Sequence, residues 1–194
     1  RHPFEHITMA VNHQADIIKA FFGDGQRWGL RVDYSLESQP LSTIAPLSLI
    51  PDLPEDFLLL NGDVLTDLNF ERFYQSHVAE GRLFTIAASR RTHTIDYGVL
   101  HVDENHRLTD FSEKPHVTYL VSMGIYAVNR SVLSLVPSER PYGFDTLMLD
   151  LLARGQEVRV ERHEGYWLDI GRPDDYAQAI EDFDQRRCHF LQNE

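Results

Sequence analysis

Two aspartates follow runs of apolar or aromatic residues in this sequence. Asp63 comes after residues 57–60 and the pair Asn61-Gly62, and Asp169 comes after residues 166–168. Carboxylates at the carboxyl ends of buried strands in an open α/β sheet face the crevice where ligands bind. Two of them offer oxygen ligands to a hard cation such as Mg²⁺, whose shell phosphate oxygens and water can complete. Simpler explanations also exist, because Asn-Gly is a strong hairpin signal and Asp169 can cap the helix that follows.

A second group of candidate residues lies in the middle of the chain. Pro115 disfavours helical backbone at the residue before it, so we expect Lys114 to be held extended, as a point charge for a phosphate. Glu113 can accept hydrogen bonds from hydroxyl groups, although a solvated Glu-Lys pair is the alternative. Gly98 and Gly124 stand in strand-like surroundings, where glycine marks either a bulge or a close approach of backbone to another group.

Composition and charge exclude several classes of partner. Lys and Arg total 18 against 30 Asp and Glu, and the net charge of −12 argues against a nucleic-acid backbone or an anionic membrane as partner. No stretch reaches the roughly 18 apolar residues of a membrane span, no signal-peptide pattern opens the chain, and Cys188 is the single cysteine, so we expect a cytoplasmic protein. The histidines lack zinc-ligand spacing, and neither a Gly-x-Ser-x-Gly elbow nor a complete Walker loop is present. Phosphate binding would therefore need local basic groups, backbone N–H groups or a metal ion.

Strand and helix patterns alternate along the chain, which is typical of a mostly parallel sheet covered by helices. We expect strands at residues 4–11, 30–34, 57–60, 83–88, 119–128 and 157–161, and helices at residues 12–22, 69–79, 145–153 and from 173 onward. Asn12 is the expected N-cap of the first helix. Residues 97–115 lose the helical period and predict a hairpin that turns at Glu104-Asn105. Because no repeat or flexible linker is visible, we expect residues 1–194 to form one domain.

Five segments, in this order, carry a resemblance to a known family: "LLLNGDVLTDLNF", "DYGVL", "FSEKP", "VSMGIYAV" and "GYWLDIGRPDDYAQA". They resemble the nucleotidyltransferases that make nucleotide sugars, a family that includes glucose-1-phosphate and mannose-1-phosphate nucleotidylyltransferases. The resemblance implies a Rossmann-like α/β/α sandwich with a mixed, mostly parallel sheet, the nucleotide-diphospho-sugar transferase fold. It also implies the reaction of an NTP with a sugar 1-phosphate to give an NDP-sugar and pyrophosphate.

The resemblance assigns a role to each candidate residue by its place in a motif. Asp63 and Asp169 match the two metal-binding aspartates of the family, which implies Mg²⁺ as cofactor. Lys114 matches the lysine that meets the sugar phosphate, so it is expected to be catalytic together with the two aspartates. Both substrates are anions, and Mg²⁺ and Lys114 would relieve their repulsion and align an in-line attack at the α-phosphate without a side-chain nucleophile.

The sugar side of the implied site consists of four substrate-binding positions. Glu113 matches the glutamate that binds sugar hydroxyls, and Lys114 beside it also belongs to this set. Gly98 and Gly124 match backbone positions that line the sugar pocket. The implied partners are an NTP and a sugar 1-phosphate, and family analogy adds a homo-oligomer.

The sequence departs from the family pattern in two places. The opening strand, the Gly-rich loop that grips the nucleotide phosphates and a downstream Pro-Lys-Pro are missing, so we expect a sheet without its first βα unit and impaired turnover by this chain. Where the family has Leu-Gly-Thr-Ala-Gly, Ser42, Ile44 and Ala45 bring Cβ atoms to positions of close backbone approach.

Two other functions remain open on the sequence. A non-catalytic protein of the same fold would bind sugar phosphates without turnover. A metal-dependent phosphohydrolase would use the same aspartates and release phosphate without a second substrate. Neither the base nor the sugar can be read from the residues.

Overall fold

The computed structural model of the chain describes residues 4–37, 39–137, 140–171 and 173–190. Its strands are β1 (His6–Val11), β2 (Arg31–Leu36), β3 (Asp56–Leu60), β4 (Val64–Thr66), β5 (Phe84–Thr94), β6 (Gly98–Val102), β7 (Leu108–Glu113), β8 (His116–Asn129), β9 (Val158–His163) and β10 (Trp167–Asp169). Its helices are α1 (Ala15–Phe22), α2 (Phe70–Ala79), α3 (Phe144–Ala153), α4 (Pro173–Gln185) and α5 (Arg187–Phe190), with short 3₁₀ helices at Gln26–Trp28, Ala45–Leu49 and Arg130–Leu135. The predicted alternation of strands and helices is confirmed, and the main difference is that β5 and β8 run longer than expected.

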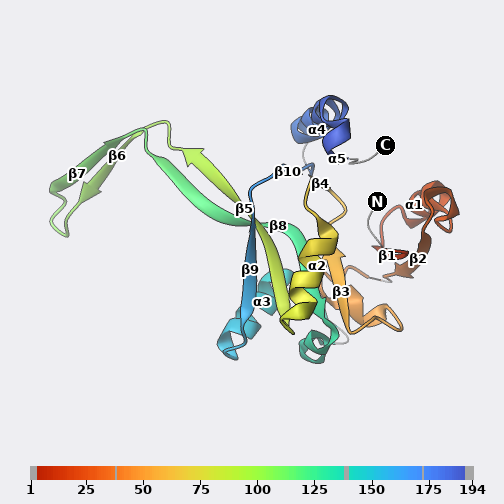
Figure 1. The fold of residues 1–194 in the computed structure, drawn as a ribbon. Helices are drawn as coiled ribbons and strands as arrows, with labels where there is room; N and C mark the ends of the chain where they lie inside the picture. Colours follow the sequence, from red (N-terminus) through yellow and green to blue (C-terminus); the bar gives the residue numbers. More distant parts are fainter. Residues whose placement is uncertain (1–3, 38, 138–139, 172, 191–194) are drawn as a thin grey trace.

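The centre of the fold is a four-stranded sheet in the order β3-β8-β5-β9 (Figure 1). β8 is antiparallel to β3 and to β5, and β9 is parallel to β5. Three of the four strands therefore run in one direction and only β8 opposes them. This arrangement agrees with the predicted mixed, mostly parallel sheet.

Helices cover both faces of this sheet because alternate side chains of β8 point to opposite sides. Val128 packs in one apolar cluster with Leu147 of α3, and Ile125 packs in the other with Phe73 of α2. All four side chains are buried. Burial of a leucine such as Leu147 stabilises the fold by about 1.5–3 kcal/mol, so the helices hold the sheet between them as an α/β/α sandwich.

A second, parallel sheet contains only β1 and β2 among the described residues, and α1 connects them. The prediction that Asn12 caps α1 is wrong, because the N-cap is Gln14, in left-handed backbone with φ 56° and without a side-chain cap hydrogen bond. Asn12 instead donates its Nδ2 hydrogen to the carbonyl of Glu37, 3.2 Å away, just past the end of β2. Its amide thus joins the two strands rather than the helix.

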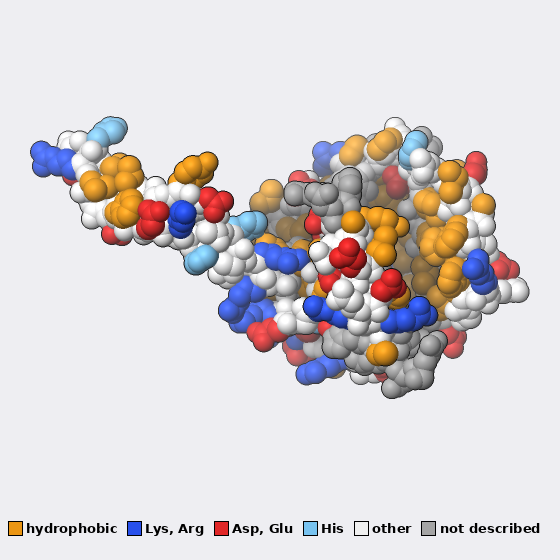
Figure 2. All heavy atoms as spheres, turned by 90° about the horizontal axis from the view of Figure 1, so that it is seen from above, with side chains coloured by type: hydrophobic (Ala, Val, Ile, Leu, Met, Phe, Trp, Pro, Cys, Tyr) orange, Lys and Arg blue, Asp and Glu red, His pale blue; other side chains and the backbone are white. Residues whose placement is uncertain are grey.

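β5 and β8 continue beyond the central sheet and lead into a hairpin that projects from the body of the molecule (Figures 1 and 2). We call residues 95–115 the arm. Its two strands, β6 and β7, are antiparallel, and the predicted turn is confirmed, because Asp103 Oδ1 accepts hydrogen bonds from the backbone N–H groups of Asn105 and Arg107 at 2.8 and 2.9 Å. Neither strand of the arm is paired with any other described strand.

A third small unit is formed by β4 and β10, which pair antiparallel over three residues each. We call these two strands the carboxylate ribbon. The hairpin explanation of Asn61-Gly62 is wrong, because β3 pairs with β8 while β4 crosses over to pair with β10, a hundred residues further along the chain. The chain therefore leaves the central sheet at Asn61 instead of folding back on it.

The helices of the described residues include none whose length and apolar composition would let it cross a bilayer. Cys188 is a free, exposed thiol. The cytoplasmic location, the homo-oligomer and the single domain remain predictions.

Candidate active site

Pairing within the carboxylate ribbon places Asp63 and Asp169 at the same end of it. Asp169 is the ladder partner of Val64, and the backbone N–H of Ile170 donates to the carbonyl of Asp63 at 2.8 Å. Two residues more than a hundred positions apart in the sequence are thereby held as cross-strand neighbours. The convergence predicted for them is present in the structure.

The two carboxylates meet at the backbone of Gly171. A Cβ atom built on this glycine would lie 3.1 Å from Asp169 Oδ1 and 3.3 Å from Asp63 Oδ2, so only glycine leaves the space between them free. Both aspartates are exposed, and the N–H of Gly171 donates to Asp169 Oδ1 at 3.0 Å. Two accessible carboxylates beside one small opening fit a hard divalent cation that takes its other ligands from phosphate and water.

The rest of that shell would have to come from a ligand, because the described part of the chain has no group of three or more His, Cys, Asp or Glu side chains placed to hold a metal. The alternative interpretation of Asp169 is partly right. Its carboxylate does accept a local backbone hydrogen bond, but from Gly171, two residues before the first residue of α4 at Pro173. This bond orients the carboxylate without filling its other acceptor positions.

Gly124 lies next to this end of the ribbon. The N–H of Asn61 donates to the carbonyl of Gly124 at 2.8 Å, and a Cβ on Gly124 would stand 2.7 Å from Asn61 Nδ2. Gly124 has φ 72°, and the pairing of β5 with β8 changes register at this level, between Ile86 and Ala88. Bulge and close approach are therefore both present, and the group that approaches is Asn61, two residues before Asp63.

Gly98, Glu113 and Lys114 lie elsewhere, where the arm begins. Gly98 pairs with Glu113 across β6 and β7, and a Cβ on Gly98 would lie 3.1 Å from Glu113 Oε2. The ladder between β5 and β8 runs on from Ala88 to Thr94 before the arm starts, an advance of about 20 Å at 3.3 Å per residue. The structure therefore brings Asp63, Asp169 and Gly124 together and leaves the other three candidates at a distance from them.

The expectation that Lys114 is extended is wrong. Its φ of 44° puts it in the left-handed region. Lys114 falls between the end of β7 at Glu113 and the start of β8 at His116, where the chain turns from one ladder into the next, with Ile95 N–H bonded to the carbonyl of Pro115 at 3.0 Å. The geometry of this junction overrides the preference that proline imposes on the preceding residue.

Two residues that the sequence did not single out connect the ribbon to the central sheet. The indole N–H of Trp167 donates to the carbonyl of Met123 at 3.0 Å. Arg91 of β5 lies over the Trp167 ring, 4.6 Å from its centre, and its Nη2 donates to the Trp167 carbonyl at 2.8 Å. Trp167 stands in the motif that contains Asp169, but Arg91 is in no motif and no local pattern could have identified it.

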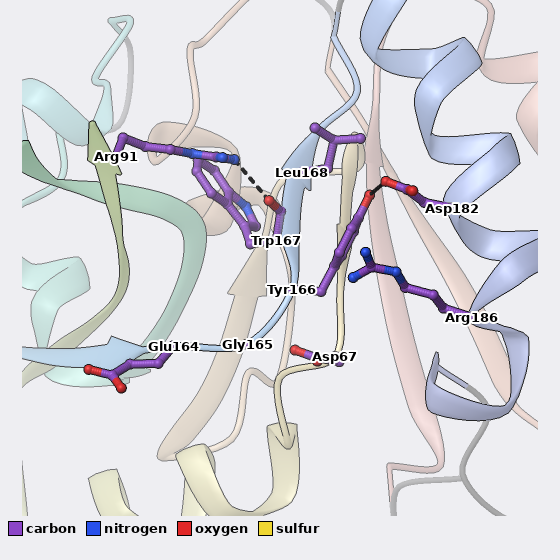
Figure 3. Close-up of a pocket in the computed structure, with 9 residues that line it drawn as sticks. All are labelled: Asp67, Arg91, Glu164, Gly165, Tyr166, Trp167, Leu168, Asp182 and Arg186. Atoms are coloured by element: carbon purple, nitrogen blue, oxygen red, sulfur yellow. Dashed lines mark hydrogen bonds between the residues drawn. The ribbon is translucent and has the colours of Figure 1, made fainter. Parts of the chain in front are cut away.

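A hollow of about 580 Å³ opens beside Trp167 (Figure 3). It is lined by Asp67, Arg91, Glu164, Gly165, Tyr166, Trp167, Leu168, Asp182 and Arg186. Its three carboxylates all have partners: His163 Nε2 lies 2.7 Å from Asp67 Oδ1, Tyr166 donates to Asp182 at 2.7 Å, and Arg162 donates to Glu164 at 3.1 Å. Burial and the hydrogen bond to Asp182 raise the pKa of Tyr166 to about 12, so this hydroxyl remains a donor at neutral pH.

The segment that departs from the family pattern lies in the core. Ile44 and Ala45 are buried in the same apolar cluster as Leu147, and their N–H groups donate to the carbonyl of Tyr142 at 3.1 and 3.0 Å. Ser42 has φ 68°, a conformation that favours glycine. The backbone at this position is thus what a glycine would adopt, although the side chain is serine.

Comparison with known proteins places the chain in a family. The model of the Nucleotidyl transferase family matches residues 2–186, and the chain belongs to this family. Mannose-1-phosphate guanylyltransferase catalytic subunit beta of Drosophila pseudoobscura pseudoobscura is 31% identical over 181 residues, which cover 90% of this chain and 48% of that protein. Mannose-1-phosphate guanyltransferase beta-B of Xenopus laevis is 29% identical over 196 residues, covering 97% and 52%.

Solved structures support the fold independently. HddC from Yersinia pseudotuberculosis matches with a TM-score of 0.67 and 23% identity over 92% of this chain and 79% of that one. HddC is also known as a complex with GMP-PN. The predicted nucleotide-diphospho-sugar transferase fold is confirmed, and the chain spans about half the length of the guanylyltransferases that it matches.

Proposed function

We propose that this chain carries the metal-binding half of a nucleotidyltransferase that joins an NTP to a sugar 1-phosphate. An oxygen of the sugar phosphate would form a bond to the α-phosphorus of the NTP. The bond from that phosphorus to the bridging oxygen would break, and pyrophosphate would leave. The names of the relatives suggest GTP and mannose 1-phosphate as the first pair of substrates to test.

The convergence of Asp63 and Asp169 on Gly171 is the observation that supports this proposal most directly. These two carboxylates would hold Mg²⁺, which when bound neutralises phosphate charge and aligns the attacking and leaving oxygens. Gly171 keeps the space between the carboxylates open, and its N–H fixes the orientation of Asp169. No acid or base among the side chains has to act, because the attacking phosphate is already an anion.

The sugar side of the proposal rests on the family motifs. Lys114 would contribute a positive charge to the sugar phosphate, and Glu113 would accept hydrogen bonds from sugar hydroxyls. Gly124 is already beside the ribbon, whereas Glu113 and Lys114 stand at the base of the arm. The proposal therefore requires the base of the arm to approach the ribbon when substrate binds.

The test is a transfer assay on the purified protein with GTP, mannose 1-phosphate and MgCl₂. We expect pyrophosphate and GDP-mannose to form in equal amounts, only when both substrates and the metal are present. Omission of each component in turn is the control, and further NTP and sugar 1-phosphate pairs follow if the first pair is inactive.

The same assay separates the other candidate functions. Release of inorganic phosphate from either substrate alone would indicate a phosphohydrolase and contradict the proposal. Binding of mannose 1-phosphate by calorimetry, with no product from any pair, would indicate a non-catalytic sugar-phosphate-binding protein.

A further inference from the structure

The carboxylate ribbon is attached to the rest of the molecule in an unusual way. In the part of the chain that the structure describes, no backbone ladder joins β4 or β10 to the four-stranded sheet. Apolar packing of Val64 and Trp167 against the cluster around Phe73 holds the ribbon close to the core. Such packing is not directional, so the position of the ribbon along the sheet depends on the short connections from β3 and β9 and on its polar contacts.

Trp167 supplies polar contacts at the end of the ribbon opposite to the carboxylates. Its indole N–H is bonded to the carbonyl of Met123, the residue before Gly124, and its backbone pairs with Thr66 of β4. Asp169 is two residues further along the same strand, so the side chains of Trp167 and Asp169 point to the same face of β10. Any shift of Trp167 therefore moves Asp169 relative to Gly124.

Arg91 of β5 contacts Trp167 from the central sheet. Its position is set by the ladder in which it pairs with Tyr119 of β8, and from there its guanidinium covers the indole ring and donates to the Trp167 carbonyl (Figure 3). The hollow beside Arg91 does not favour an anionic ligand, because three carboxylates line it against two arginines. Arg91 therefore acts through its contact with Trp167 and not by binding a ligand.

We propose that Arg91 and Trp167 are positioning residues that fix Asp169 opposite Asp63 and so set the affinity of the site for a divalent cation. The inference rests on the proposed function for its biological meaning, but it concerns metal binding and is measurable without turnover. Groups that orient a metal ligand through hydrogen bonds typically change affinity by about 10–100-fold when removed.

The experiment compares Mn²⁺ binding, followed by the electron paramagnetic resonance signal of free Mn²⁺, in four variants of the protein. Arg91→Met and Trp167→Phe remove the two polar contacts, and we expect each to raise the Mn²⁺ dissociation constant about tenfold. Arg91→Lys keeps one donor without the planar stack, so it should recover part of the loss. Arg90→Met, an exposed neighbour on β5, is the matched control and should bind as the wild type does.

The thermal midpoint of each variant separates positioning from a general loss of stability. A role in stability alone would lower the midpoint and leave Mn²⁺ affinity equal to that of Arg90→Met, which would overturn the inference. If Arg91→Met does not fold, Arg91→Lys and Trp167→Phe decide in the same way. Weakened Mn²⁺ binding in a protein that transfers no nucleotide would contradict the proposed function only, whereas active variants with unchanged affinity would contradict the inference only.

Discussion

The described residues form two antiparallel ribbons outside the central sheet, and the ribbons differ in what surrounds them. The arm has the longer ladder, with five residues in β6 and six in β7, while the carboxylate ribbon has three residues in each strand. The carboxylate ribbon nevertheless lies against an apolar cluster and is fixed by Trp167 and Arg91. The arm exposes its apolar side chains, among them Leu100, Leu108 and Phe111 (Figure 2).

Burial, not the number of ladder hydrogen bonds, decides which ribbon can hold its side chains in place. A two-stranded hairpin by itself is marginally stable in water, and it becomes fixed when one face is covered. Asp63 and Asp169 therefore have a defined geometry in the absence of substrate. Glu113 and Lys114 would gain theirs only when the base of the arm meets something else.

The largest expected effect tests the energetic side of this comparison. Leu147→Ala removes a fully buried side chain from the core, and we expect it to lower the free energy of unfolding by about 2–5 kcal/mol. Phe111→Ala on the arm removes a ring that is 53% exposed, so its effect should stay within about 0.5 kcal/mol. Urea unfolding at one temperature measures both. A large cost for Phe111→Ala would mean that the arm is covered in solution.

Carboxylates of the two ribbons should also differ in their effect on nucleotidyl transfer and metal binding. Asp63→Asn removes one of the two ribbon carboxylates, and we expect nucleotidyl transfer to fall about 100-fold or more because the charge of the metal is no longer held against the substrate. Glu113→Gln is the matched change on the arm. It should leave Mn²⁺ affinity unaltered and raise the KM for the sugar 1-phosphate. Equal losses of Mn²⁺ affinity in the two variants would show that the arm belongs to the metal site.

The sequence predicts most of the fold because burial patterns are local. Residues 57–60 are apolar without interruption and form most of β3, and Asn69 caps α2 through a hydrogen bond from Arg72 N–H. The failures come from contacts between residues that are distant in the sequence. Gln14 rather than Asn12 precedes α1, because the Asn12 side chain is bonded to the end of β2, which no pattern around residue 12 reveals.

The site is predicted only in part, because the order of the motifs in the sequence does not give the distances between them in the structure. Asp63 and Asp169 could be paired from their positions after two strands, and the structure places them as cross-strand neighbours. The family resemblance predicts that Gly98 and Gly124 line one pocket, yet Gly98 lies in the arm and Gly124 lies beside Asn61. Arg91 could not be identified from the sequence, because its role comes from a contact with a residue 76 positions away.

Glycine substitutions extend the comparison, with an expected loss of stability of up to about 1–3 kcal/mol. Gly124→Ala places a Cβ 2.7 Å from Asn61 Nδ2 at a φ of 72°, and such strain should cost about 1–3 kcal/mol of stability. Gly98→Ala meets mainly the ring of Phe111, an exposed side chain that can rotate away, so a cost within about 0.5 kcal/mol is expected. Thermal unfolding of both variants is the measurement. Similar costs would indicate that the arm is as tightly constrained as β8 beside the ribbon.

Lys114→Ala asks whether the base of the arm reaches the ribbon during the reaction. If it does, loss of a charged contact to the sugar phosphate should raise the KM for the sugar 1-phosphate about tenfold while Mn²⁺ affinity stays constant. Steady-state kinetics with varied sugar 1-phosphate provides the test, and Arg107→Ala near the tip of the arm is the charge-matched control. An unchanged KM would show that Lys114 does not contact the sugar phosphate.

The smallest expected effect concerns a buried histidine of α2. His77 of α2 is fully buried, with Nδ1 2.8 Å from Thr85 Oγ1 and Nε2 3.3 Å from Asp56 Oδ1. Burial lowers its pKa below the usual 6.5, and this outweighs the opposing attraction of Asp56, while Arg82 adds to the lowering and Glu161 opposes it. The unfolded chain therefore binds the proton first as the pH falls.

It follows that the neutral His77 ring stabilises the fold fully above pH 6.5 and that this contribution declines as the pH falls below 6.5 toward the lower pKa of the folded state. We expect the stability difference between the wild type and His77→Gln to shrink over that interval, as measured by urea unfolding at successive pH values. His101→Gln, an exposed histidine of the arm, is the control for general effects of histidine loss. Parallel profiles for the wild type and His77→Gln would show that the ring is not held neutral. In that case Asp56 would compensate the positive charge of the buried ring.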